Sequence, residues 1–134
     1  MGVTKIGGSV DIAISGLRAE ATRMRLTAEN IANAQTSRTP DGTPYRRKEL
    51  VLSAGGPGGA VQIEGVTQDM STDFKSVYMP GHPDAGDNGM VQMPNVDLPV
   101  EMINLITASR AYQANAAILK RFQGMVDATL ELLR

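Results

Sequence analysis

The sequence lacks several residue types on which whole classes of function depend. Its 134 residues include no Cys and no Trp, and only three Tyr and two Phe. The absence of Cys excludes disulfides, thiolate metal ligands and Cys nucleophiles together. With so few aromatic residues, a large aromatic core is not expected. Much of the apolar content lies near the two ends, which leaves the Gly- and Pro-rich middle only a thin core, so the chain's stability should depend partly on contacts outside itself.

Long apolar runs and charge of one sign are also missing. No stretch approaches the ~18 consecutive apolar residues of a membrane span, so we expect no membrane-spanning segment. The first residues lack the apolar core and small-residue cleavage site of a secretory signal, so we expect no cleaved signal peptide. The net charge is −1, with Lys and Arg scattered among Asp and Glu, which argues against nucleic acid as a partner.

The residues needed for catalysis or metal binding are scarce. The single histidine, His82, lies in a Pro- and Gly-rich stretch, and no glycine-rich phosphate loop is present. His82, Asp84 and Asp87 could together hold a cation, but carboxylates in turns are more often solvated turn formers. The sequence therefore predicts a protein that is not an enzyme and has no cofactor or metal.

Both ends of the chain carry an apolar stripe with the alternating four-three spacing of a helix that packs on other helices. The first stripe consists of Val3, Gly7, Val10, Ile14, Leu17, Ala21, Met24, Ala28 and Ile31. The second consists of Leu98, Met102, Leu105, Ser109, Tyr112, Ala116, Leu119, Gln123, Val126, Leu130 and Leu133. A further apolar line widens the second face: Ile103, Ile106, Ile118, Phe122, Met125 and Leu132. The two ends could pack on each other as a hairpin, on helices of other molecules, or on both at once.

The local signals predict a helix, a small β-rich insert and a second helix. Ser9 is expected to cap a helix that runs to about Ala34, and Asp97 to cap one that runs to the chain end. Four strands are expected at 45–52, 60–67, 76–79 and 90–93, with a turn at Asn88–Gly89 before the last. The glycines and proline of 55–59 predict an exposed loop without regular structure. The predicted fold is mainly α, with an N-terminal helical domain at 1–36, a β-rich insert at 37–96 and a C-terminal helical domain at 97–134.

Three segments together resemble a known family. SGLRAEATRMRLTAENIANAQT, followed by Tyr45–Arg46, resembles the N-terminal signature of the axial proteins of the bacterial flagellum. VEMINLITASRAYQANAAILKRFQGMVDATLEL, with its Tyr-Gln-Ala-Asn core at 112–115, resembles their C-terminal signature. PDGTPYRRKE and VYMPGHPDAGDNGMVQMPNVD are similar to the middle of the C-type proximal rod proteins of the basal body. The similarity covers nearly the whole chain.

This resemblance implies a structural subunit of the proximal rod, the part of the driveshaft that crosses the periplasm and transmits torque. The terminal helices would polymerise as a coiled-coil-like inner tube, and the β-rich insert would lie on the outside. The implied partners are further copies of the chain, proximal and distal rod subunits, and the adaptor at the export gate and MS ring. The flagellar type III apparatus would export the chain without a cleavable signal. A B-type proximal rod protein and a non-polymerising coiled-coil adaptor of a secretion apparatus remain alternatives.

The stripes and the resemblance give a set of expected assembly residues: Val10, Ile14, Leu17, Met24, Ile31, Asn33, Met102, Leu105, Tyr112, Asn115, Leu119, Val126, Leu130 and Leu133. Within this set, Asn33, Tyr112 and Asn115 are expected to make specific polar contacts, because buried amides and phenols need partners. The alternative for these three is helix capping or ordinary core packing.

Overall fold

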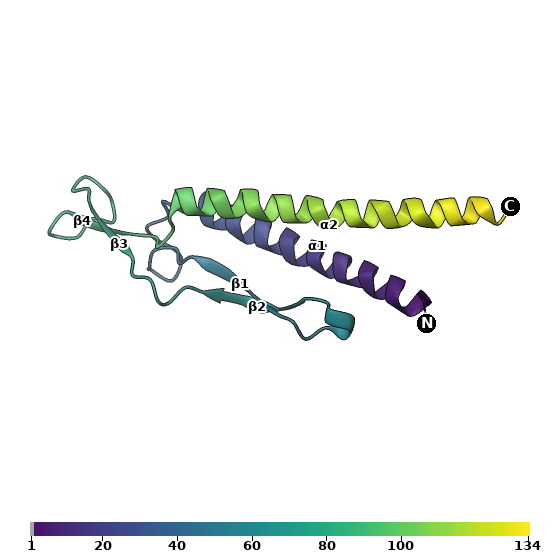
Figure 1. The fold of residues 1–134 in the computed structure, drawn as a ribbon. Coiled ribbons are helices and arrows are strands. Elements are labelled where there is room, and N and C mark those ends of the chain that lie inside the picture. Colours follow the sequence, from purple (N-terminus) through teal and green to yellow (C-terminus); the bar gives the residue numbers. More distant parts are fainter. Residues whose placement is uncertain (1) are drawn as a thin grey trace.

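Two long helices dominate the computed structural model, which describes residues 2–134, with side chains described from Gly8 onward. Helix α1 spans Gly2–Ala32 and helix α2 spans Leu98–Leu132. They run antiparallel, lie closest where α1 ends and α2 begins, and diverge toward the two chain ends (Figure 1). The predicted fold class, mainly α with terminal helices packed on each other, is confirmed.

The predicted start of the first helix is wrong. α1 begins at Gly2, so Ser9 lies inside the helix and is not its N-cap. Glycine in a helix interior costs only about 0.5–1 kcal/mol, so Gly7 and Gly8 do not interrupt the helix. At its other end, the Asn33 backbone N–H still donates to Glu29 O, and tighter turns follow through Thr36.

The predicted start of the second helix is confirmed. Asp97 has an extended backbone, and its carboxylate accepts a hydrogen bond from Val100 N. Pro99 lies in the first turn, where a missing backbone N–H costs nothing. Glu101 also lies in this turn, where the helix dipole favours a negative charge.

The insert forms two separate two-stranded antiparallel sheets. Strand β1 (Lys48–Ser53) pairs with β2 (Gln62–Gln68), and β3 (Lys75–Tyr78) pairs with β4 (Met90–Met93). The first hairpin runs alongside α1, and the second extends past the junction of the helices (Figure 1). The first strand begins three residues later than predicted, because Tyr45 N donates to Thr36 O and holds that segment against the end of α1.

A bulge in β2 explains which side of the first hairpin is apolar. Leu50 pairs with Val66 and Leu52 pairs with Ile63, while the register shifts between these two pairs. Directly opposed residues point to the same face of the sheet. The extra residue in β2 shifts the alternation by one, so that residues after the bulge point to the opposite face from the one that simple alternation predicts. Ile63 and Val66 therefore lie on one face with Leu50 and Leu52, although simple alternation would separate them.

The loop at 55–59 is exposed, as predicted, but it does contain regular structure. Pro57–Gly59 form a short 3₁₀ turn, η1, in which Gly58 takes the left-handed conformation with a φ of 71°. Beyond this turn, Val61 N donates to Ser15 Oγ at 3.1 Å. The hairpin tip is thus tied to the middle of α1.

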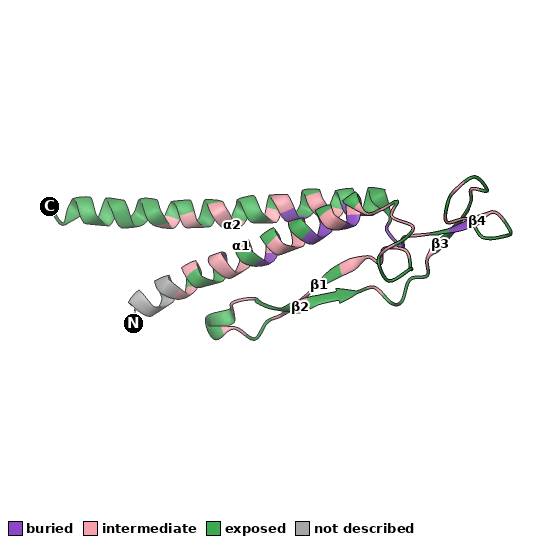
Figure 2. Cartoon of the chain, turned by 180° about the vertical axis from the view of Figure 1, so that it is seen from behind, coloured by how far each residue is buried: buried purple, intermediate pink, exposed green. Residues whose placement is uncertain are grey.

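The buried core is small and divided between two places. Its helical part consists of Ala13, Ala19, Leu26 and Ala108, and its part in the insert consists of Tyr45, Val91 and Val96. Figure 2 shows most buried residues along the end of α1 and the start of α2, a further buried segment in β4, and the far part of α2 exposed. Such a core leaves much apolar surface of the helices uncovered.

Candidate assembly surface and polar junction

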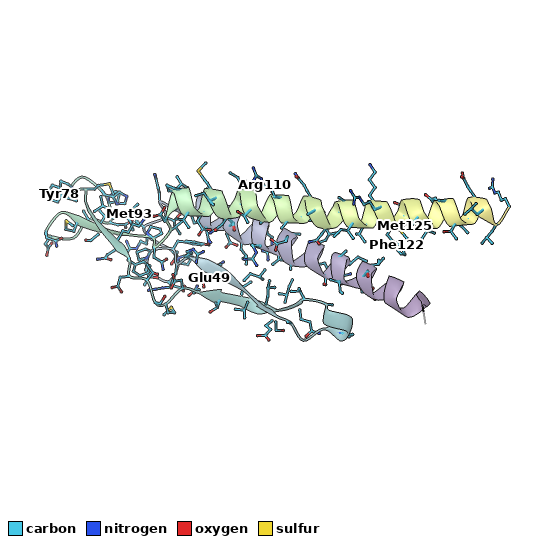
Figure 3. The ribbon with its side chains drawn as sticks, in the orientation of Figure 1. Glu49, Tyr78, Met93, Arg110, Phe122 and Met125 are labelled. Atoms are coloured by element: carbon cyan, nitrogen blue, oxygen red, sulfur yellow. The ribbon has the colours of Figure 1, made fainter. Side chains whose placement is uncertain are left out.

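Helix α2 exposes a large apolar surface. The exposed large apolar side chains of α2, together with Leu133 at its C-terminal cap, are Leu98, Val100, Met102, Ile103, Ile106, Tyr112, Ile118, Met125, Val126, Leu130, Leu132 and Leu133. Leu132, near the C-terminal end, is 87% exposed. Figure 3 shows Phe122 and Met125 on this far part of α2, beyond Arg110. Monomeric soluble proteins rarely expose apolar patches of this kind, and larger ones mark interaction sites.

The expected assembly residues on α2 divide into two groups. Leu105, Asn115 and Leu119 are half-buried, whereas five residues are exposed and free to contact another molecule. These five are Met102, Tyr112, Val126, Leu130 and Leu133.

On α1, the predicted stripe is not the face that is buried. Among its described members, Val10, Ile14, Leu17, Met24 and Ile31 are half-buried, and Ala21 and Ala28 are exposed. Val3 and Gly7 lie outside the residues whose side chains are described. The fully buried positions of α1 are Ala13, Ala19, Leu26, Thr27 and Asn30. The stripe thus flanks the face that α2 and the hairpin cover. A four-three pattern alone could not distinguish the two faces, because the buried one contains small and polar residues.

A polar junction joins the two helices to the first hairpin, and Asn30 is its centre. The Asn30 Nδ2 donates to Lys48 O at 3.0 Å and to Glu101 Oε2 at 3.1 Å. Its Oδ1 accepts from Lys48 N at 2.9 Å and from the Tyr45 hydroxyl at 2.8 Å. The amide therefore makes all four of its hydrogen bonds. Two of them go to the backbone N–H and C=O of Lys48, which would pair with a neighbouring strand in a wider sheet.

The junction also contains a buried charge. Glu101 is 1% exposed, and its Oε1 accepts from Arg47 Nε at 2.5 Å. Arg47 also pairs with Glu49, and Lys48 pairs with Glu29. Burial, with the nearby carboxylates of Glu29 and Glu101, raises the pKa of Tyr45 to about 12. The phenol accordingly stays protonated and can donate to Asn30.

Asn95 connects the rest of the insert to this junction. Its Oδ1 accepts from Arg47 N at 2.8 Å, and its Nδ2 donates to Asp69 O and Thr72 O. Arg46 also donates to Asp69 O, and its guanidinium lies 4.2 Å from the Phe74 ring centre. Side chains of the 45–47 segment and Asn95 thus hold the 69–74 turn against the ends of both helices.

The three predicted polar contact residues differ in their surroundings. Asn33 Nδ2 donates to Glu29 O, and its Oδ1 accepts from Thr36, so it stabilises the end of its own helix. Asn115 lies against Gly16 of α1, where a Cβ would come within 2.7 Å of its Nδ2. Tyr112 is exposed. Of the three, Asn115 is the residue that lies against the other helix.

Comparison with known proteins places this architecture in a family. The family model "Flagellar basal body rod FlgEFG protein C-terminal" matches residues 87–132. The flagellar basal-body rod protein FlgC of Salmonella typhimurium is 44% identical over 126 residues, covering 91% of this chain and 93% of the relative. The chain belongs to the FlgC family of flagellar basal-body rod proteins.

More distant FlgC proteins agree. FlgC of Borreliella burgdorferi is 36% identical over 94% of this chain and 96% of its own length. FlgC of Bacillus subtilis is 34% identical over 92% of this chain and 95% of its own length. The resemblance to C-type rod proteins is thus confirmed, and the B-type alternative is not favoured. Because this is a family of structural proteins, the chain is a structural protein of the basal-body rod and not an enzyme.

Two of the three residues considered for a cation, His82 and Asp84, have structural roles in this FlgC-family chain. Asp84 accepts from Ser37 Oγ at 2.7 Å and from Arg38, and its N–H donates to His82 Nδ1. These contacts tie the loop after α1 to the loop between β3 and β4. Among the described residues, no group of three or more His, Cys, Asp or Glu could hold a metal. Over the same part of the chain, no helix is long and apolar enough to cross a membrane.

The sequence prediction missed the junction residues Asn30, Arg47 and Glu101. Asn30 and Glu101 lie in the two segments that carry the family resemblance, but they are 71 positions apart. Nothing local indicates that they meet. The one available signal was Glu101, a charged residue in the first turn of an apolar helix. The same pattern is equally typical of an exposed residue that interacts favourably with the helix dipole.

Proposed function

We propose that this chain is a subunit of the proximal rod that polymerises through α1 and α2 and transmits torque along the flagellar driveshaft. The observation that carries the proposal is the set of exposed apolar side chains along α2. Burying a Leu or Ile side chain contributes roughly 1.5–3 kcal/mol, so covering even a few of them with neighbouring helices would stabilise an assembly strongly.

The arrangement of the surfaces supports an inner helical wall and an outer insert. Residues 1–36 and 97–134 would form the axial part, and residues 37–96 would lie on the outside. The hairpins lie to one side of α1 and beyond the junction, which leaves much of α2 free (Figure 1). A contact between different faces of identical or related subunits does not close on itself and so builds a helical stack.

The partners follow from this role. Further copies of the chain, the other proximal and distal rod subunits, and the adaptor at the export gate and MS ring would cover the exposed helix faces. Delivery to the periplasmic side would use the flagellar type III export apparatus without cleavage of a signal. Nucleic acid has no place in this scheme, and the near-neutral charge agrees with that.

The experiment that tests the proposal is electron microscopy of purified basal bodies that carry a tag inserted at Gly58. This residue is exposed, adopts φ 71°, and has open space around it, so the insertion should not disturb the fold. Tag density on the outside of the proximal rod would support both the position and the orientation. Tag density in the inner wall, or a protein found only in a small soluble complex, would refute them, and the latter would favour the adaptor.

A matched pair of substitutions separates assembly from folding. Leu130→Asp places a charge on the exposed apolar face, where burial against a neighbour would leave it unpaired. Ala128→Asp adds the same charge two residues away, outside both apolar lines. Rod assembly should be lost in the first variant and kept in the second, and equal behaviour of the two would contradict the proposed interface.

A further inference from the structure

The fully buried apolar residues of α1 and α2 are mostly small. Three of the four buried apolar residues in the two helices are Ala13, Ala19 and Ala108. A methyl group contributes only about 0.8 kcal/mol when buried, and one alanine fits against a helix much as another does. Apolar packing alone therefore discriminates poorly between one helix register and the next.

Two contacts of a different kind connect the same helices. Asn30 donates to the buried carboxylate of Glu101 at 3.1 Å, and Asn115 lies against Gly16 so closely that a Cβ there would be 2.7 Å from its Nδ2. Asn30 follows Gly16 by fourteen positions, and Asn115 follows Glu101 by fourteen. In an antiparallel pair, equal spacing means that both contacts belong to one register, two heptads apart, or about 21 Å along the axis.

We propose that these four residues are a register lock, which sets how far α2 is displaced along α1. The lock consists of Asn30, Glu101, Gly16 and Asn115. Buried polar groups can select one helix register even where they add little stability, because every other register leaves them without partners. The best known devices of this kind act between chains, and here the lock acts within one.

The neighbouring registers fail at both contacts. Sliding α2 by one heptad in one direction places Arg23 opposite Asn115 and Ala108 opposite Asn30. Sliding it the other way places Ser9 opposite Asn115 and leaves Asn30 opposite Pro94, which precedes the helix. In both cases a residue with a Cβ replaces Gly16 where the helices approach closely, and the Asn30 bond to Glu101 is lost.

The lock also determines where the exposed apolar face of α2 lies. A slip of one heptad would move Met125, Val126 and Leu130 by about 10 Å relative to α1 and the hairpin. Any partner that contacts α2 together with α1 or the hairpin would then bind a different surface. This inference concerns the chain's own fold and does not depend on the proposed function.

The chain lacks Cys, so introduced pairs can report the register by disulfide formation in the full-length protein in solution. In the register set by the lock, the pair Leu26→Cys and Leu105→Cys lies at the same height along the two helix axes. Two other pairs lie at the same height only after a slip of one heptad. They are Leu26→Cys with Tyr112→Cys, and Ala19→Cys with Leu105→Cys. With the lock intact, the first pair should cross-link at least about tenfold more than either slipped pair, a preference of about 1.4 kcal/mol.

The lock is then removed from α2 alone by Glu101→Leu with Asn115→Ala, which leaves the other three hydrogen bonds of Asn30 in place. The matched control makes the same kinds of change at exposed positions of the same helix, Glu131→Leu with Gln113→Ala. Cross-linking of the slipped pairs should rise by about tenfold without the lock and should not change in the control.

Circular dichroism of each variant accompanies the cross-linking. The proposal requires that the variant without the lock keeps its helix content while it loses its unique register. Retention of the single register would overturn the proposal. Loss of helix content would overturn it as well, because the contacts would then supply stability and not register. Equal cross-linking of all three pairs with the lock intact would also refute it.

Discussion

The buried carboxylate of Glu101 should make the two partners of its ion pair unequal in their effect on stability. Arg47→Met removes the guanidinium and leaves a negative charge that is 1% exposed, with Asn30 as its remaining partner. Removing one partner of a buried pair usually costs 3–5 kcal/mol. Because the Arg47 side chain is itself 21% exposed, we expect the lower end, about 3 kcal/mol.

Glu101→Leu should cost much less. Arg47 would keep Glu49 as a partner and would keep its access to water, and Asn30 would keep its bonds to Lys48 and Tyr45. We expect a loss of about 1 kcal/mol, the net value of a typical hydrogen bond. The double variant should also cost about 1 kcal/mol, because no unpaired buried charge remains, so the coupling energy is about 3 kcal/mol.

The assay is urea unfolding of the full-length chain followed by circular dichroism at 222 nm, with a double-mutant cycle over the two sites. Glu49→Gln is the control, since Glu49 is 48% exposed and should contribute under about 1 kcal/mol. Equal costs for Arg47→Met and Glu101→Leu, or a double variant whose cost equals the sum of the two, would refute the role assigned to the buried charge.

Two further predictions concern the turns and pH. Gly89→Ala should destabilise the chain by more than about 1 kcal/mol in thermal unfolding, since φ is 73° and a Cβ would lie 2.7 Å from the Tyr78 ring. Gly58→Ala has a similar φ of 71° but open space, so it should cost less, and equal costs would contradict the steric argument. Between pH 10 and 12 the unfolded chain releases the Tyr45 proton while the folded chain keeps it, because burial raises the pKa to about 12. Stability should therefore fall as pH rises through this range, by up to about 2 kcal/mol. Tyr45→Phe should abolish this part of the fall in stability and should cost about 1 kcal/mol near neutral pH. Urea unfolding at each pH measures both, and an identical fall in the two proteins would contradict the role of Tyr45.

The larger features of the fold could be predicted from the sequence because their signals are local. Asp97 followed by Pro99 marks the start of α2, and the four residues of β4 were predicted without error. The turn before β4 was also recognised, since Asn88 Oδ1 accepts from Met90 N and Gly89 has a φ of 73°. The start of α1 was missed because the cost of two glycines is small compared with the helix that follows them.

The pairing within β2 could not be predicted, because it depends on a bulge that exists only against β1. Alternation in the 60–67 segment separates Ile63 from Val66, and the register shift brings them to one face. The same limit applies to the face by which α1 is buried. Ala13, Ala19 and Asn30 are weak signals of burial, and they are covered only once other elements pack on α1.

What the sequence by itself determined is the helix, insert and helix order, the apolar character of both helices, and membership of a family of structural proteins. These depend on short-range periodicity, capping and recognisable motifs. What only the tertiary structure decided is the junction of Asn30, Arg47 and Glu101, the register of α2 on α1, and the part of the apolar surface that stays exposed. Hydrogen bonds between side chains up to 71 positions apart have no local signature, because their geometry exists only when all three segments are assembled.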